Sequence, residues 1–511
     1  MKKTLTYLLL ALIFCLAFFL RTMYLSKDVL TFGYDQARDA YSSIAIASGD
    51  IKIQGPPSSA PGLFHGVFYY YFLAPAYTLG HGSPVAAAYY LAFINSLTVF
   101  TVFLLGYLAT KKGWVGLTSA FLFAISFEST QYATWLSNPT VAIVTVPLLY
   151  LGLWQWSESK SKWGPILVAV GLGLSVQSEI FLAYHIVPIV IWLAIRKKNI
   201  SIANKIGKTQ ILTSILILGI MLVSFLFSEI KFGFNGINGV KSLLINSDAN
   251  LAYTKSIGDF LTLYLNQIGR IFAFNSYPGN IGYGGGFVIV LAIYSLIKKD
   301  KFGTILSLWL FSHLSVVSVG GVSTPFLMVG IGPAISLIIG YYLVKWWGSG
   351  YKLITIGIII VLIYGNLSFI FKENSKGSTL FSIQKDMVLS KQLAAIDYTY
   401  HEANGEMFTT NSLTSPLWID IVWTYLYKWY GVKNYGFAPE WNGKDQIGQL
   451  DSLQKVSDNT KLFFLILEPM DGIPPKYLEQ AIQEEDVVST LVDQKEFGTI
   501  IVQKRYKNNY K

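Results

Sequence analysis

A cluster of charged residues lies close to the N-terminus, in the segment FGYDQARDAY of residues 32–41. If this segment opens a helix, Asp35 lies in its first turn, and Arg38 and Asp39 return to the same side one turn later. A carboxylate beside a guanidinium can take a proton from a hydroxyl group and hold a phosphate. In the alternative interpretation, Asp35 only caps the helix, and Arg38 and Asp39 form a solvated surface pair.

Acidic residues before position 372 are scarce, and most of them fall on the same side of the hydrophobic runs. Nine of the eleven lie in two polar segments or at the matching ends of runs: Asp28, Asp35, Asp39, Asp50, Glu128, Glu179, Glu229, Asp248 and Asp259. Only Glu158 and Asp300 fall at the opposite ends, where lysines flank them. Carboxylates supply proton acceptors and cation ligands that apolar spans lack, so we expect the functional surface at the first face.

The composition is that of a chain that lives in lipid. Of its 511 residues, 53% are hydrophobic and 13% are charged, against about 25% charged in ordinary soluble domains. Residues 1–371 hold 24 of the 39 basic and 11 of the 29 acidic side chains, which leaves 15 and 18 for the tail. The basic residues sort to one end of the apolar runs, as the positive-inside rule predicts, so the net charge of +10 does not indicate a nucleic-acid partner.

Apolar runs predict a polytopic α-helical membrane protein with about 11 transmembrane helices. The runs are 5–25, 84–110, 114–127, 139–156, 163–176, 180–195, 211–227, 284–297, 302–319, 325–347 and 353–371. Lysine and arginine occur in alternate connections, which predicts a cytoplasmic N-terminus and a plasma-membrane module over residues 1–371. Two outer loops, 26–83 and 228–283, and a tail over 372–511 are then extracytoplasmic.

The two outer loops carry distinct features. Residues 67–79 form an aromatic-rich apolar run too short to span, which predicts a juxtamembrane helix at the outer surface. The Gly-rich stretch 279–286 predicts a hinge for a mobile flap over the site, because no lysine and helix start follow it as a phosphate-binding loop requires. Cys15 is the only cysteine, so no intrachain disulfide can form.

The tail predicts a small C-terminal α/β domain. Residues 461–467 form a buried strand pattern, 476–485 a helix pattern, and 487–492 and 498–502 two further strands joined through a turn at 495–497. Four tryptophans and several tyrosines crowd into residues 398–441. Such a cluster is typical of a domain core or a membrane-facing surface, while stacking on a sugar is the less favoured alternative.

With these residues in view, the chain resembles the GT-C membrane glycosyltransferases, in the branch that uses polyprenyl-phosphate sugars and includes protein O-mannosyltransferases and the lipid A aminoarabinose transferase. The resemblance consists of an acid after the first span with a nearby arginine, a Gly-Asp pair, and a histidine leading into a Tyr-rich helix. The corresponding segments here are residues 35–40, 49–51 and 65–71. Their succession covers roughly the first 200 residues.

The resemblance implies that Asp35 is the catalytic base toward an acceptor hydroxyl. It implies that Arg38 and His65 contact the lipid phosphate, with Asp39 and Tyr69 as further substrate-binding residues. Other candidates are the polar residues at the outer ends of spans and the cations of the second outer loop: Asn138, Gln177, Glu179, Lys241, Lys255 and Arg270. Gln36 and Asn138 stand where relatives often carry acids, which leaves a second carboxylate contact and any divalent metal open. Gln177 and Glu179 are equally well explained as a polar cluster at a helix end.

The expected reaction is GT-C type hexosyl or pentosyl transfer, with inversion, from a polyprenyl-phosphate-linked donor to an extracytoplasmic glycan, lipid or protein acceptor. No cofactor is certain. A lipid or sugar transporter is one rival, but it predicts ionisable residues near mid-bilayer, where only His185 and His313 lie. A polymerase or ligase of lipid-linked glycans is another, since it would share the outer site and the lipid donor. A sensor is the last, although about eleven spans are excessive for an anchor.

Overall fold

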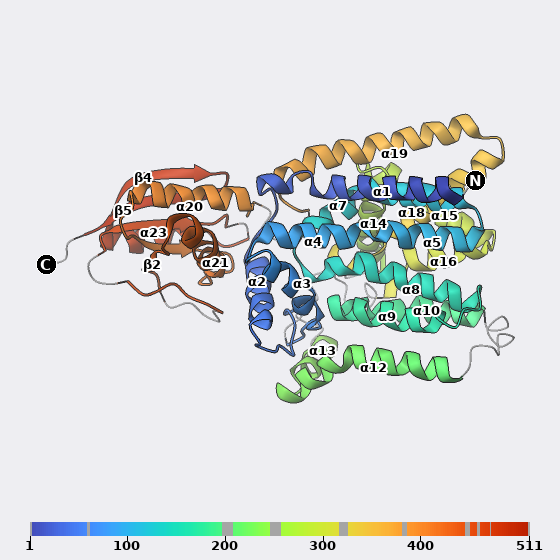
Figure 1. Ribbon diagram of the computed structural model, residues 1–511, viewed down its shortest axis with the longest axis horizontal. Helices are drawn as coiled ribbons and strands as arrows, with labels where there is room; N and C mark the ends of the chain where they lie inside the picture. The colour runs from blue at the N-terminus through green and yellow to red at the C-terminus, as the bar shows by residue number, and fades with distance from the viewer. Residues whose placement is uncertain are drawn as a thin grey trace.

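The computed structural model contains a long helical bundle and, at one end of it, a domain built on a β-sheet (Figure 1). It describes residues 3–58, 62–196, 208–245, 257–315, 325–380, 386–444, 450–456, 460–470 and 472–508. The bundle helices are α1 Lys3–Thr22, α4 Pro84–Ser96, α5 Thr98–Thr110, α6 Gly113–Ala124, α7 Phe127–Thr134, α8 Ala142–Ser157, α9 Gly164–Ser178, α10 Ile186–Ile195, α12 Lys208–Lys231, α14 Ile257–Phe274, α15 Ile281–Ile297, α16 Lys301–Leu310, α18 Gly332–Gly348 and α19 Lys352–Glu373.

Hydropathy and length make this a multi-pass membrane protein. Five helical segments are long and apolar enough to cross a bilayer: Lys3–Lys27, Pro84–Thr110, Asn138–Ser157, Thr209–Lys231 and Lys352–Lys376. Shorter apolar helices lie at 113–124, 164–178, 180–195, 281–297 and 301–310. The polytopic helical class is therefore confirmed, whereas the number of eleven spans stays a prediction.

Both predicted outer loops contain helices. In the first, α2 (Tyr34–Ala47) and α3 (Phe68–Leu79) pack against each other at the end of the bundle nearest the sheet domain (Figure 1), which confirms the helix predicted at 67–79. The second is not an open loop, because α13 (Asn235–Ile245) and α14 occupy most of what is described of it. Connections with 3-10 geometry, η2 Asn138–Val141 and η3 Ile180–His185, lead into α8 and α10.

The prediction of a hinge in the Gly-rich stretch 279–286 is wrong, because helix α15 begins within this stretch. Asn280 caps α15 by accepting a hydrogen bond from the Tyr283 N–H, and the glycines that follow are helical. A Cβ at Gly285 would lie 2.6 Å from the Gly269 carbonyl oxygen and 2.8 Å from the Gly269 Cα of α14. These glycines therefore serve close packing of two helices, as small residues do in membranes.

Replacing Gly285 by alanine is expected to destabilise the protein by about 1–3 kcal/mol, because the new methyl group would meet backbone atoms that cannot rotate away. Gly286 is the matched control, since a Cβ there meets nothing within 4 Å. Gly286→Ala should be neutral or stabilising by up to about 1 kcal/mol, the gain in helix propensity. Thermal unfolding of the two variants in detergent checks this, and equal melting temperatures would contradict the packing argument.

The C-terminal domain is the predicted α/β unit. Its elements are α20 Leu389–Ala403, β1 Thr409–Leu413, α21 Ile421–Leu426, η7 Tyr427–Gly431, α22 Val432–Tyr435, β2 Glu440–Trp441, β3 Leu462–Leu467, α23 Lys476–Val488, β4 Ser489–Phe497 and β5 Ile500–Lys507. The strand order is β2-β1-β3-β5-β4. Strand β1 is parallel to β2 and β3, with Thr409 opposite Phe463, and β5 is antiparallel to β3 and β4.

The last hairpin turns later than predicted. β4 continues to Phe497, and the turn falls at Gly498. The backbone φ of Gly498 is +68°, a value that residues with a side chain rarely adopt. The aromatic cluster is mostly core, because Trp423, Tyr425 and Tyr427 are buried, while Trp418 is exposed.

The sheet domain docks on the start of α2 through this aromatic core. The ring of Tyr425 lies 5.5 Å from that of Phe32 and 5.0 Å from that of Tyr41. The Phe32 N–H donates to the Met387 carbonyl at 2.8 Å, and Gln392 Nε2 donates to the Phe32 carbonyl at 2.7 Å. The tail thus fixes the backbone directly before Asp35.

Candidate active site

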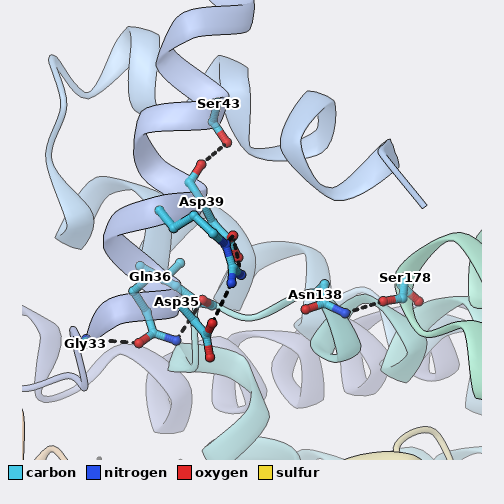
Figure 2. A network of polar contacts seen from close by, with 9 residues as sticks. Gly33, Asp35, Gln36, Asp39, Ser43, Asn138 and Ser178 are labelled. Atoms are coloured by element: carbon cyan, nitrogen blue, oxygen red, sulfur yellow. Dashed lines mark hydrogen bonds and ion pairs between the residues drawn. The ribbon is translucent and has the colours of Figure 1, made fainter. Parts of the chain in front are cut away.

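Helix α2 begins at Tyr34, directly after the N-cap Gly33, whose backbone is extended. The Gln36 side chain accepts a hydrogen bond from the Gly33 N–H at 2.9 Å, and its Nε2 donates to the Leu136 carbonyl at 3.2 Å (Figure 2). Gln36 therefore both caps the helix and ties it to the segment after α7. The sequence argument missed this role, although the position three residues after the N-cap is where a capping glutamine is expected.

Asp35, Arg38 and Asp39 form one connected ion-pair group on α2 (Figure 2). Arg38 Nη1 donates to Asp35 Oδ1 at 2.7 Å, while its Nη2 and Nε donate to Asp39 Oδ1 at 2.7 and 2.9 Å. The side chain of Asp35 is 52% exposed, whereas those of Arg38 and Asp39 are 10% and 1% exposed. The alternative of a solvated surface pair is wrong for Arg38 and Asp39, because both side chains are buried beside the tyrosines of α3.

The buried part of this group is electrostatically unusual. Burial raises the pKa of Asp39 to about 7, although the neighbouring Arg38 cation acts to lower it. Burial and the Asp39 charge also raise the pKa of Tyr69 well above its usual value. Asp39 Oδ2 and the Tyr69 hydroxyl are buried without a hydrogen-bond partner among the described residues. Since buried polar atoms normally have partners, these two atoms keep a hydrogen-bonding capacity that the described residues do not use.

His65 is held in a neutral form. Its Nδ1 accepts the Ile180 N–H at 3.3 Å, which leaves the ring proton on Nε2. Burial, helped by the Arg38 charge, lowers the pKa of His65 to about 3. His65 is therefore a neutral N–H donor at Nε2, and its contact with the lipid phosphate stays a prediction.

Three further predicted residues lie around His65. Glu179 Oε1 is 3.4 Å from His65 Nδ1, and Glu179 Oε2 is buried without a partner among the described residues. Asn138 Nδ2 donates to the Ser178 carbonyl at 2.6 Å (Figure 2). Gln177 accepts the Phe68 N–H at 3.2 Å, at the start of α3. The structure thus brings Gln177 and Glu179 to the segment that carries His65, and Asn138 to the residue between them, Ser178.

Gln177 also joins two bundle helices, because its Nε2 donates to the Met221 carbonyl at 2.5 Å and to Ser224 Oγ at 2.8 Å on α12. Gln177→Leu is expected to destabilise the protein by about 1–3 kcal/mol, since the partly buried groups that Gln177 pairs with would lose their partner. Ser224→Ala removes one of these contacts and should cost about 1 kcal/mol or less. Thermal unfolding in detergent measures both, and a Ser224→Ala loss as large as that of Gln177→Leu would contradict this account.

The cations predicted in the second outer loop are not joined to this cluster by any contact of the described residues. Arg270 is exposed on α14, and Lys241 is exposed on α13. Lys255 lies outside the described residues. Two aromatic residues that the sequence argument did not single out are nearer: the Arg38 guanidinium lies 5.5 Å from the centre of the Tyr34 ring, and Tyr70 lies against Arg38 and Asp39.

A cavity of about 310 Å³ opens beside His65. It is bounded by the 53–65 loop, by α12 and by α13, and its lining includes Phe64, Phe225 and Ile237 together with Glu229. Asp35 is not part of this lining. Within the described ranges, no three His, Cys, Asp or Glu side chains group as metal ligands would.

No protein-family model and no curated protein sequence matches this chain. Several solved structures match it in fold. The crystal structure of ArnT from Cupriavidus metallidurans in the apo state aligns with a TM-score of 0.60 at 10% identity, over 97% of each chain. The same protein bound to undecaprenyl phosphate aligns with a TM-score of 0.57 at 12% identity, over 99% of this chain and 98% of that one. The archaeal oligosaccharyltransferase AglB from Archaeoglobus fulgidus, in complex with an inhibitory peptide and a dolichol phosphate, aligns at 0.45 and 14% identity, over 86% and 64%.

The alignment with ArnT covers the bundle and the C-terminal domain together. The chain therefore shares the fold of ArnT over nearly its whole length, which agrees with the fold that the sequence resemblance implied.

Proposed function

We propose that this protein is an integral membrane glycosyltransferase that moves a sugar from a polyprenyl-phosphate donor to an acceptor hydroxyl outside the cytoplasm. The observation that carries the proposal is the half-exposed Asp35 carboxylate, held by a buried arginine on a juxtamembrane helix. The shared fold with ArnT supports the reaction class, and the undecaprenyl phosphate in one ArnT structure supports a polyprenyl-phosphate donor.

The reaction needs a base and a way to stabilise the leaving group. The acceptor oxygen forms a new bond to the anomeric carbon while the bond from that carbon to the phosphate oxygen breaks. Asp35 takes the hydroxyl proton, and the polyprenyl phosphate leaves with the electron pair of the broken bond. A single displacement of this kind inverts the anomeric configuration.

Arg38 acts in this proposal mainly by holding Asp35. Both of its terminal nitrogens and its Nε already donate to carboxylates, so the guanidinium fixes the direction of the Asp35 side chain. The neutral His65 supplies an N–H donor at Nε2, and three buried oxygens without partners among the described residues supply contacts for sugar hydroxyls. They are Asp39 Oδ2, Tyr69 Oη and Glu179 Oε2.

The remaining predictions complete the proposal. Residues 1–371 form the membrane module, the N-terminus is cytoplasmic, and the domain over 372–511 is extracytoplasmic. These assignments rest on the alternation of basic residues between spans. Arg270, Lys241 and Lys255 stay candidates for contacts to the lipid phosphate.

The test is transfer of label by the purified full-length chain. Radiolabelled polyprenyl-phosphate sugars are incubated with the protein in detergent and a mixed envelope fraction as acceptor, and the lipid and non-lipid phases are counted. We expect the radiolabel to move from the lipid phase to the non-lipid phase only when the purified protein is present. If the label stays on the lipid but changes leaflet when the protein is in sealed vesicles, the chain is a transporter and the proposal fails.

A further inference from the structure

A second cavity, with a polar lining, lies at the opposite end of the bundle from the candidate active site. It encloses about 640 Å³ between the α5–α6 turn, the ends of α8 and α18, and the start of α16. In Figure 1 this is the right-hand end of the bundle, away from the sheet domain. The positive-inside rule places that end in the cytoplasm. Four lysines line the cavity: Lys111, Lys112, Lys301 and Lys345.

The two carboxylates in the lining are already occupied by protein groups. Glu158 pairs with the Arg196 guanidinium through contacts of 2.5 and 2.8 Å. Asp300 accepts the Gly303 N–H at 2.7 Å and the Tyr341 hydroxyl at 2.8 Å. Arg196, which lies outside the lining, neutralises Glu158, so the four lysines of the lining face one remaining acid, Asp300. The cavity is therefore strongly cationic.

The lysines themselves are only weakly engaged. Lys301 Nζ is 3.7 Å from Glu158, and Lys345 lies over the rings of Tyr341 and Tyr342 at 5.5 and 5.6 Å. Within the described ranges, Lys111 and Lys112 form no ion pair. Their ammonium groups are thus free to bind an anion.

The deeper lining is apolar. Leu108, Val115, Val344 and the rings of Trp154 and Phe302, which meet edge to face at 5.6 Å, form it. A soluble phosphate would use only the lysines, whereas a phospholipid would also cover this surface with the first part of its acyl chains. The cytoplasmic leaflet supplies such lipids, since its surface is anionic and attracts lysines near the membrane.

We propose that this cavity binds the phosphate headgroup of an anionic phospholipid of the cytoplasmic leaflet. The site is separate from the proposed sugar-transfer site and does not depend on it. Its bound lipid would hold the ends of α5, α8, α16 and α18 together.

The test compares lipid binding by the purified full-length chain in native mass spectrometry. The lining variant Lys112→Gln/Lys301→Gln/Lys345→Gln is compared with Lys160→Gln/Lys162→Gln/Lys298→Gln, which makes the same charge change with exposed lysines that do not line the cavity. Phosphatidylglycerol is the probe, with phosphatidylcholine and inorganic phosphate as comparisons. We expect the lining variant to bind phosphatidylglycerol about 100-fold more weakly and the control to change by less than about threefold.

Three results would overturn the proposal. They are equal losses in both triple variants, phosphatidylcholine binding as tight as that of phosphatidylglycerol, and displacement of the lipid by inorganic phosphate at matched concentration. Melting temperatures without added lipid verify that the variants are folded. The single change Lys112→Gln, in an exposed turn, should weaken phosphatidylglycerol binding by about fivefold.

Discussion

Replacing Asp35 by asparagine is expected to lower the rate of sugar transfer by about 10²–10⁴-fold, the usual contribution of a general base. Asparagine keeps the shape of the side chain and can still accept a hydrogen bond from Arg38, but it cannot take up a proton. Because the Asp35 side chain is half exposed, the change should leave the fold intact. Initial rates of label transfer from the polyprenyl-phosphate donor measure the effect.

Asp50→Asn is the matched control. Asp50 lies in the same outer segment, its side chain is 59% exposed, and it too is paired with a cation, Lys52. Removing that charge should change transfer by less than about threefold, since an exposed ion pair contributes little. Full activity of Asp35→Asn, or an equal loss in both variants, would remove Asp35 from the role of base.

Replacing Arg38 by methionine is expected to destabilise the protein by about 3–5 kcal/mol, the cost of leaving one partner of a buried ion pair alone. Asp39 is 1% exposed and receives two of its hydrogen bonds from Arg38. Transfer should also fall, because Asp35 loses the group that orients it. Chemical or thermal unfolding in detergent measures the change in stability.

The loss caused by Arg38→Met should depend on pH. Without Arg38, burial and the nearby Asp35 charge both raise the pKa of Asp39 in the folded state above about 7, against about 3.9 in the unfolded chain. A carboxyl whose folded pKa is raised contributes most stability when it is protonated, and that contribution is lost as pH rises from about 4 through the folded pKa. The defect should therefore be larger at pH 8 than at pH 5.

Asp39→Asn provides the control for this account. The double variant Arg38→Met/Asp39→Asn removes both charges, so it should be more stable than Arg38→Met alone at pH 8 and nearly insensitive to pH in this range. Equal stability of the single and double variants at pH 8 would show that the buried charge of Asp39 is not the cause.

The sequence alone determined what depends on local pattern. Hydropathy, lysine alternation and strand or turn signals identified a polytopic helical protein, a juxtamembrane helix near residues 67–79 and a C-terminal α/β domain. These are properties of neighbouring residues, so they are readable before the chain folds. The spacing of Asp35 and Arg38 likewise predicted their contact, since they lie one helical turn apart.

Only the tertiary structure decided what depends on residues distant in the chain. His65 is held by Ile180, 115 positions away, and burial there lowers the pKa of its ring to about 3. Arg38 and Asp39 became a buried pair because α3 and the C-terminal domain cover α2. The glycines near residue 285 became a helix contact rather than a hinge because α14 packs against them. Burial sets charge and packing, and it arises from contacts that no local spacing encodes.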